Sequence, residues 1–164
     1  LLDLMAEIPR AFDLRPDLVT SPAFFDLAGA EWIDRLVSAL HDTGAALYAA
    51  LTYDGTETWH PSHAEDAAVL AAFQRDMQRD KGLGPALGGA AATYLATALT
   101  EAGFMVETAH SPWRLTSPRD TALIAALAEG TARAAGASPD WSASRKAASA
   151  VTVGHLDIWA TPPA

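Results

Sequence analysis

The chain has 164 residues, half of them hydrophobic and 19% charged, with a formal net charge of −9 and no cysteine. This composition predicts one globular domain with a buried core, and it excludes disulfides, thiolate nucleophiles and zinc–sulfur sites. The acidic balance argues against nucleic acid as the main partner, because phosphate binding needs clustered lysine and arginine. No secretion signal or membrane span is visible, so we expect a cytoplasmic protein with no membrane partner.

A strand–helix–strand unit occupies residues 17–53. Residues 17–20 form a short apolar strand, a helix with apolar spacing follows at residues 31–40, and Gly44 suits the left-handed residue that closes it. Residues 45–53 are almost continuously apolar, which is typical of a parallel strand covered on both faces, and Asp54-Gly55 ends them. Such units build open α/β sheets, which bind ligands beyond the carboxyl ends of their strands.

Two helices and a strand are predicted next. The S-x-x-E pattern of Ser62 and Glu65 indicates a helix that begins there. A glycine-rich loop at residues 82–89 leads to a second helix, which Gly103 ends. Residues 104–108 then alternate as a strand does.

The last third of the chain is predicted to hold two helices and a final strand. Ser117 and Ser138 each precede a proline, a pattern typical of helix starts, and Gly136 would end the first of the two helices. Residues 150–160 form the last strand, in which Gly154 suits a bulge. The final two strands flank a helical excursion and need not be parallel.

This order of elements resembles the C-terminal half of a class I S-adenosylmethionine-dependent methyltransferase. Residues 17–20, 45–53, 104–108 and 151–159 resemble strands 4, 5, 6 and 7 of that family's sheet, and D-K-G-L-G-P-A-L-G at residues 80–88 is similar to a segment of uncharacterised bacterial methyltransferase-like proteins. The resemblance implies a Rossmann-like three-layer α/β sandwich. Its sheet would be mostly parallel, ordered 4-5-7-6 with the last strand antiparallel. Residues 1–164 would form a single domain that lacks the N-terminal half.

The resemblance also implies the cofactor S-adenosylmethionine. Asp3 would meet the adenine amino group, and Thr20, Ser21, Phe24 and Phe25 would line the site after strand 4. The S-P-A-F segment is similar to the [DNS]-P-P-[YFW] motif of amino-group methyltransferases, although a plain turn is the alternative. The family's G-x-G-x-G loop and its acidic residue after strand 2 are absent, and the chain starts L-L-D without methionine. We therefore expect a fragment that binds the cofactor poorly by itself.

Histidines supply the candidate acid–base groups. His60 and His110 lie near the expected carboxyl ends of strands, and either could take a proton from a hydroxyl acceptor. His60 and His63 could share a metal, but no third ligand is patterned nearby, so we predict no metal site and keep surface histidines as the alternative. His155 and Asp157 fall on one face of the last strand, as a dyad or merely as polar neighbours.

Aromatic residues near the open end of the sheet are the substrate-binding candidates. Tyr53, Trp59 and Trp113 could shape a pocket for an apolar or cationic substrate, with core packing as the alternative. Lys81, beside two glycines, could bind an anion or merely belong to a connector between helices.

The leading hypothesis is methyl transfer from S-adenosylmethionine to a small-molecule or protein acceptor, carried out by a longer polypeptide. The alternative is a non-catalytic α/β interaction module. Its apolar edge strand at residues 17–20 would pair with a second copy, as a homodimer, or with the missing N-terminal half. A different open α/β domain, such as a flavodoxin-like one, is the third possibility.

Overall fold

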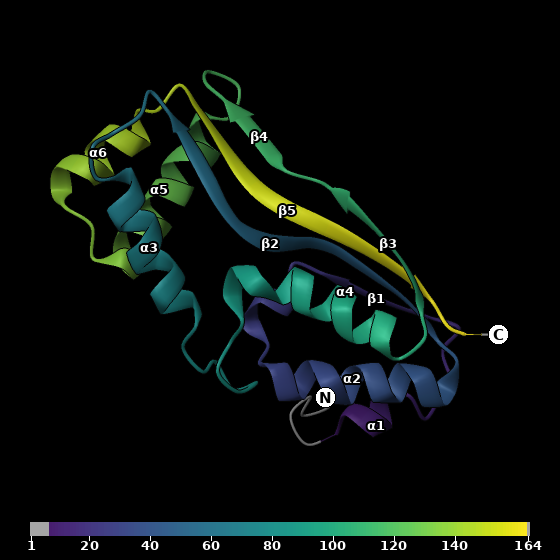
Figure 1. The fold of residues 1–164 in the computed structure, drawn as a ribbon. Coiled ribbons are helices and arrows are strands. Elements are labelled where there is room, and N and C mark those ends of the chain that lie inside the picture. Colours follow the sequence, from purple (N-terminus) through teal and green to yellow (C-terminus); the bar gives the residue numbers. More distant parts are fainter. Residues whose placement is uncertain (1–6, 164) are drawn as a thin grey trace.

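The computed structural model describes residues 7–163, which form a five-stranded sheet with helices packed against it (Figure 1). The strands are β1 (Leu18–Pro22), β2 (Ala46–His60), β3 (Met105–His110), β4 (Trp113–Thr116) and β5 (Ala150–Thr161). Their order is β1-β2-β5-β3, and β4 also pairs with β5. β1 and β2 are parallel, whereas β5 is antiparallel to β2, β3 and β4. The sheet is therefore mixed, and the expectation of a mostly parallel sheet is not confirmed.

The helices form two groups at opposite ends of the sheet (Figure 1). The first group comprises α1 (Ile8–Ala11), α2 (Ala30–Thr43) and α4 (Ala91–Glu101). The second group comprises α3 (Asp66–Met77), α5 (Thr121–Ala135) and α6 (Pro139–Lys146). Short 3-10 turns, η1 (Phe25–Leu27) and η2 (Gly88–Ala90), precede α2 and α4. We call the two groups, each with the strand residues that it covers, the α2–α4 region and the α3–α5–α6 region.

No helix within residues 7–163 is long and apolar enough to cross a membrane.

The α2–α4 region is packed by aliphatic side chains. Leu40, Leu95 and Leu99 of the helices are fully buried against Leu47 and Ile158 of the sheet. Because side chains alternate along a strand, the neighbours of these two strand residues face away from the helices.

Tyr48 and Trp159 are those neighbours, and they lie on a face of the sheet that no described helix covers at this end. They are 38% and 39% exposed, and their rings contact each other at a centroid distance of 6.2 Å. The sheet at this end therefore presents an uncovered aromatic face.

The α3–α5–α6 region covers the opposite face at the other end of the sheet. Val151 and Val153 of β5 pack in its core, whereas Ile158 and Ala160, which are out of phase with them, pack in the core of the α2–α4 region. Since the period of a strand is two residues, the two helix groups bury different faces of the same strand.

The strand β2 crosses from one region to the other through irregularities that the sequence did not predict. Its register against β5 shifts between Ala49 and Thr52 and again between Tyr53 and Glu57. The prediction that Asp54-Gly55 ends the strand is therefore wrong. The Asp54 carboxylate instead accepts hydrogen bonds from the Thr56 backbone N–H at 2.9 Å and hydroxyl at 2.6 Å, which holds a bulge inside a longer strand.

Helix boundaries were partly predicted. Gly44 and Gly136 close their helices in the left-handed conformation, and the Ser138 hydroxyl accepts a hydrogen bond from the Trp141 N–H at 3.1 Å, as expected. The predicted start at Ser62 is wrong: α3 begins later, and its first residue accepts from the His63 N–H.

The start predicted at Ser117 is also wrong, because α5 begins at Thr121. The Asp120 carboxylate accepts instead from the Thr116 N–H at 2.8 Å. That bond ties the helix to β4, a strand that the sequence analysis did not predict.

Candidate functional site

The strongest candidate site is a cavity of about 430 Å³ between the sheet, α3 and α5. Its lining includes Asp26 from η1, Tyr53 and Glu57 from β2, Trp113 from β4 and His155 from β5. The turn η1 follows β1 and β4 follows β3, so the cavity lies beyond the carboxyl ends of these two strands. Open α/β sheets bind their ligands at this edge.

Strand pairing brings the ring side chains of the cavity together. Tyr53 and His155 are direct partners across β2 and β5, and each is only 7% exposed. Their ring centroids are 6.4 Å apart, and the Trp113 ring lies 5.2 Å from that of His155.

The register shift that follows Tyr53 lies opposite a residue without a side chain. A Cβ at Gly154 would collide with the side chains of Thr56 and Asp54 in the bulge. Because Gly154 has no side chain, it leaves room for the bulge of β2. The bulge lies between Tyr53 and Glu57, the two residues of β2 that line the cavity.

Two polar atoms at this site are buried without a hydrogen bond. In residues 7–163, four buried side-chain polar atoms lack a partner, and the Tyr53 hydroxyl and His155 Nδ1 are two of them. The Gln74 carboxamide lies close enough to lower the pKa of Tyr53 against the larger effect of burial, but it is not in good hydrogen-bond geometry with the hydroxyl. Its nitrogen donates one of its two protons to the Gly55 carbonyl at 2.6 Å. Buried polar groups are nearly always hydrogen-bonded, so the two atoms call for a water or a ligand.

Burial shifts the ionisation of all four titratable groups of the cavity. Desolvation raises the pKa of the Asp26 and Glu57 carboxyls, even though the Trp59 Nε1–H donates to Glu57 at 3.1 Å. Desolvation also raises the pKa of the Tyr53 hydroxyl and lowers that of His155. The cavity therefore contains a neutral phenol, an imidazole that favours its neutral form and two carboxylates that are costly to leave without a counter-charge.

Of the predicted substrate-binding residues, the structure brings Tyr53 and Trp113 together in this cavity. Trp59 lies behind it, edge-to-face with Trp141 at 6.0 Å, and lines a separate cavity of about 250 Å³. Lys81 donates from Nζ to the carbonyls of Asp76 and Met77 at 3.2 and 2.6 Å, where it caps the end of α3.

The predicted catalytic histidines, His60 and His110, lie elsewhere. They are the last residues of β2 and β3, both exposed, and neither lines the cavity. The imidazole at the cavity is that of His155, which the sequence analysis considered only in a pair with Asp157. The Asp157 carboxylate is bound instead by the Ser111 hydroxyl at 2.5 Å and the Leu51 N–H at 2.8 Å.

A second group of metal-binding residue types lies at the far end of β2. His63, Glu65 and Asp140 place their ligand atoms within 4.8 Å of one another. His63 Nδ1 accepts from the Glu65 N–H at 3.2 Å, so the neutral ring carries its proton on Nε2 and donates it to Asp140 at 3.2 Å. Both nitrogens are thus engaged within the protein, and we assign no metal to this group.

The residues predicted to contact the cofactor lie in a different cavity. Thr20, Ser21, Phe24 and Phe25 line an apolar space of about 380 Å³ between β1, α1 and α2, and Asp3 lies outside the described residues. Apart from the two hydroxyls, its described lining is apolar, with no carboxylate or cation. It could accept an apolar ring, but it offers no partner for the charged amino-acid end of S-adenosylmethionine.

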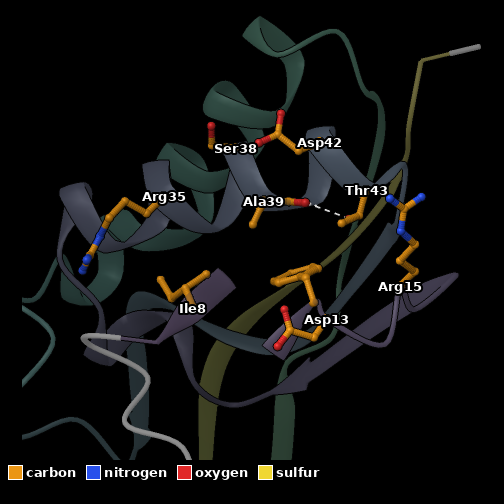
Figure 2. A pocket seen from close by; sticks show the side chains of 9 residues that line it. Ile8, Asp13, Arg15, Arg35, Ser38, Ala39, Asp42 and Thr43 are labelled. Carbon is orange, nitrogen blue, oxygen red and sulfur yellow. Dashed lines mark hydrogen bonds between the residues drawn. The ribbon is translucent and has the colours of Figure 1, made fainter. Parts of the chain in front are cut away.

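A groove between α1 and α2 has a volume of about 600 Å³, larger than that of the cavity with Tyr53 and His155, but it is less suited to a ligand (Figure 2). Arg35 lies at one end, Arg15 and Asp42 lie at the other, and Asp13 lies across from α2, and these charged side chains do not point toward a common centre (Figure 2). The groove thus lacks the convergent polar groups that are typical of binding sites.

Asp26 and Glu57 of the cavity are not among the site residues predicted from the sequence. Asp26 lies in a turn that was predicted only as a loop, and Glu57 lies in the polar segment that was thought to follow the strand. The signal that could have found Glu57 is alternation, because Glu57 and Trp59 continue the odd-numbered face that includes Tyr53.

No family model matches the chain, and no curated protein matches it. Functional inference therefore depends on the cavity and on the sheet that positions it.

Proposed function

We propose that the chain is the acceptor-binding part of an S-adenosylmethionine-dependent methyltransferase, with the Tyr53–His155 cavity holding the acceptor. The observation that carries the proposal is the position of this cavity, beyond the carboxyl ends of β1 and β3. These strands belong to a sheet ordered β1-β2-β5-β3, in which β5 is antiparallel to its neighbours. This is the order of strands 4-5-7-6 in the family that the sequence resembles. Under the proposal, the sheet is part of a Rossmann-like sandwich that continues beyond β1.

The uncovered parts of the sheet support such a continuation. In the described sheet β1 pairs only with β2, and Leu18 on this edge is 43% exposed. The Tyr48–Trp159 face is also uncovered. A further strand beside β1, with helices over this face, would bury both features.

The residues of the cavity have defined tasks in this proposal. The aromatic walls and carboxylates would orient the acceptor and exclude water around it. His155, which burial keeps neutral near pH 7, can accept a proton from an acceptor hydroxyl or amine. Geometry thus favours His155 over His60 and His110 as the proton acceptor.

Titration calorimetry with S-adenosylhomocysteine tests the proposal. The protein to use is the natural polypeptide that contains this chain, and we expect it to bind one equivalent. Ser21→Leu, which narrows the apolar cavity beside β1, should weaken binding, whereas Thr116→Leu at an exposed position of β4 should not. Complete absence of binding by the natural polypeptide would refute the enzymatic proposal.

The open edge of β1 favours a second candidate, a non-catalytic module that pairs through this edge. Exposed strand edges invite pairing with another chain, and charges on the edge prevent it. Light scattering after size-exclusion chromatography would show a dimer that Leu18→Lys dissociates and Thr116→Lys leaves intact. A chain that remains monomeric at high concentration would exclude self-pairing.

A further inference from the structure

The cavity carries negative charge with no cation in its described lining. Asp26 and Glu57 both belong to the lining, and no lysine or arginine of residues 7–163 does. Lys81 lies outside the lining, at the end of α3, and its charge changes the pKa of Asp26 less than burial does. The chain as a whole has a net charge of −9, which adds to the negative potential at the cavity. Such a site favours a cation and repels an anion.

Aromatic rings form much of the remaining wall. Tyr53 and Phe73 meet edge-to-face at 6.2 Å, and Trp113 lies against His155 on the other side. The faces of such rings attract ammonium groups, while their area favours an apolar ligand body.

The Tyr53 hydroxyl and His155 Nδ1 indicate which hydrogen-bonding groups a ligand should carry. Tyr53 and His155 are each more than nine-tenths buried, and their hydroxyl and Nδ1 atoms have no partner in good hydrogen-bond geometry. Gln74 and the Val153 backbone lie near these two side chains and affect their pKa values. A neutral imidazole nitrogen and a phenol oxygen can both accept, so a ligand with N–H donors would satisfy them after a small adjustment of the side chains.

We propose that this cavity binds an organic cation, a primary amine attached to an apolar or aromatic body, with Asp26 and Glu57 as its counter-ions. The inference rests on the proposed function in one respect: it names the class of methyl acceptor that the cavity would hold. The bound ammonium would pass one proton to His155 and so free the nitrogen lone pair that takes the methyl group.

The cavity beside β1 lacks a carboxylate, and the charged side chains of the groove between α1 and α2 do not converge. The cavity behind Trp59 also has two carboxylates in its lining. There, however, the Asp66 carboxylate accepts from Trp141 and lies 3.4 Å from Arg145 Nη1, so it is already compensated within the protein.

Three probes of similar shape and different charge test the inference by titration calorimetry. These are phenethylamine, neutral 2-phenylethanol and anionic phenylacetate. We expect the amine to bind the chain at least about tenfold more tightly than the alcohol, because hydrogen bonds to charged groups are stronger than those between neutral groups. The anion should not bind.

Charge-neutralising variants locate the binding. Asp26→Asn and Glu57→Gln should each weaken amine binding by about tenfold on the same basis. Asp42→Asn removes an equal charge from an exposed position of α2 and should leave the affinity for the amine unchanged. Circular dichroism shows that each variant is folded.

Several results would overturn the inference: equal binding of phenylacetate, no effect of the two neutralising substitutions together, or no saturable amine binding by the folded chain. The titration with S-adenosylhomocysteine is read separately. If the natural polypeptide binds S-adenosylhomocysteine but not the amine, only this inference fails. If it binds the amine but not S-adenosylhomocysteine, the methyltransferase proposal fails and the cation site remains.

Discussion

The two ends of the sheet are stabilised by different chemistry. In the α2–α4 region, Leu40, Leu95 and Leu99 are fully buried against aliphatic strand residues. In the α3–α5–α6 region the core contains Trp141 and Arg145, each 1% exposed, together with polar contacts. The aliphatic end needs no directional partners, whereas the other end depends on hydrogen bonds, and the candidate ligand site lies beside the polar end.

Arg145 organises the polar end. Its Nη1 donates to the Pro61 carbonyl at 2.7 Å and lies 3.4 Å from an Asp66 carboxylate oxygen, and its guanidinium lies 6.0 Å from the centre of the Trp59 ring. The other Asp66 oxygen accepts from Trp141 Nε1 at 2.8 Å. One buried cation thus joins α6 to α3 and to the end of β2.

The largest expected effect comes from the junction between the two regions. A Cβ added at Gly89 would lie 2.5 Å from the Cα and 2.7 Å from the nitrogen of Gly55 in the bulge. Since backbone atoms cannot move aside cheaply, Gly89→Ala should lower the free energy of unfolding by about 3 kcal/mol or more. Urea denaturation measures this change.

Gly130→Ala is the matched control for this substitution. A Cβ there meets nothing within 4 Å, and the residue lies inside α5. The substitution should be neutral or should stabilise by up to about 1 kcal/mol. Equal effects at the two positions would show that the junction is not tightly packed.

Removal of the buried cation Arg145 is the second test, because it should destabilise the polar end and leave the contacts of the aliphatic end unchanged. Arg145→Met leaves Asp66 partly uncompensated and should cost about 3 kcal/mol of unfolding free energy. Lys146→Met removes a cation that is exposed and lies 3.4 Å from Glu129, and it should change stability by less than about 1 kcal/mol. If Arg145→Met were neutral in thermal denaturation, the network would not stabilise this end.

A third and smaller effect concerns pH. The folded-state pKa of His155 lies below its ordinary value of 6.5, because desolvation outweighs the attraction of Asp54, Asp26 and Asp157. As the pH falls through the ordinary pKa of histidine, the unfolded chain binds the proton before the folded chain does. The free energy of unfolding is therefore larger at higher pH and decreases as the pH falls. Between about pH 7.5 and 5.5, His155→Gln should therefore lose less stability than the unchanged protein. An identical slope would contradict the assigned burial.

The smallest effect is expected on the uncovered face. Trp159 is 39% exposed and contacts Tyr48, so Trp159→Thr should change the stability of the isolated chain by less than about 1 kcal/mol. The same substitution should weaken any association that covers this face, which sedimentation velocity would detect. A large loss of stability in the monomer would show that the face is already covered within the chain.

The sequence predicted the aliphatic end better than the polar end. At the aliphatic end, helical spacing located Leu95 and Leu99, and Gly44 marked the end of α2, because these signals are local. At the polar end Gly136 marked the end of α5, but the predicted starts of α3 and α5 were wrong. The bulge at Asp54-Gly55 was mistaken for a turn, since both conformations favour the same residues.

The candidate site was predicted only in part for the same reason. Tyr53 and Trp113 were expected near the open end of the sheet, and both line the cavity. Asp26 and Glu57 join them only through long-range pairing and through the bulge in β2. Alternation with Tyr53 could have indicated Glu57, but no local pattern indicates the contact of Asp26.

The most direct test of the cavity as the ligand site is a titration of the ¹⁵N-labelled chain with phenethylamine, followed through its tryptophan indole signals. Trp113 lines the cavity, Trp32 lines the apolar space beside β1, and Trp159 lies on the uncovered face. We expect the indole signal of Trp113, identified by its loss in Trp113→Phe, to shift saturably while those of Trp32 and Trp159 stay fixed. A saturable shift of Trp32 or Trp159 with Trp113 unchanged would contradict the assignment of the ligand site.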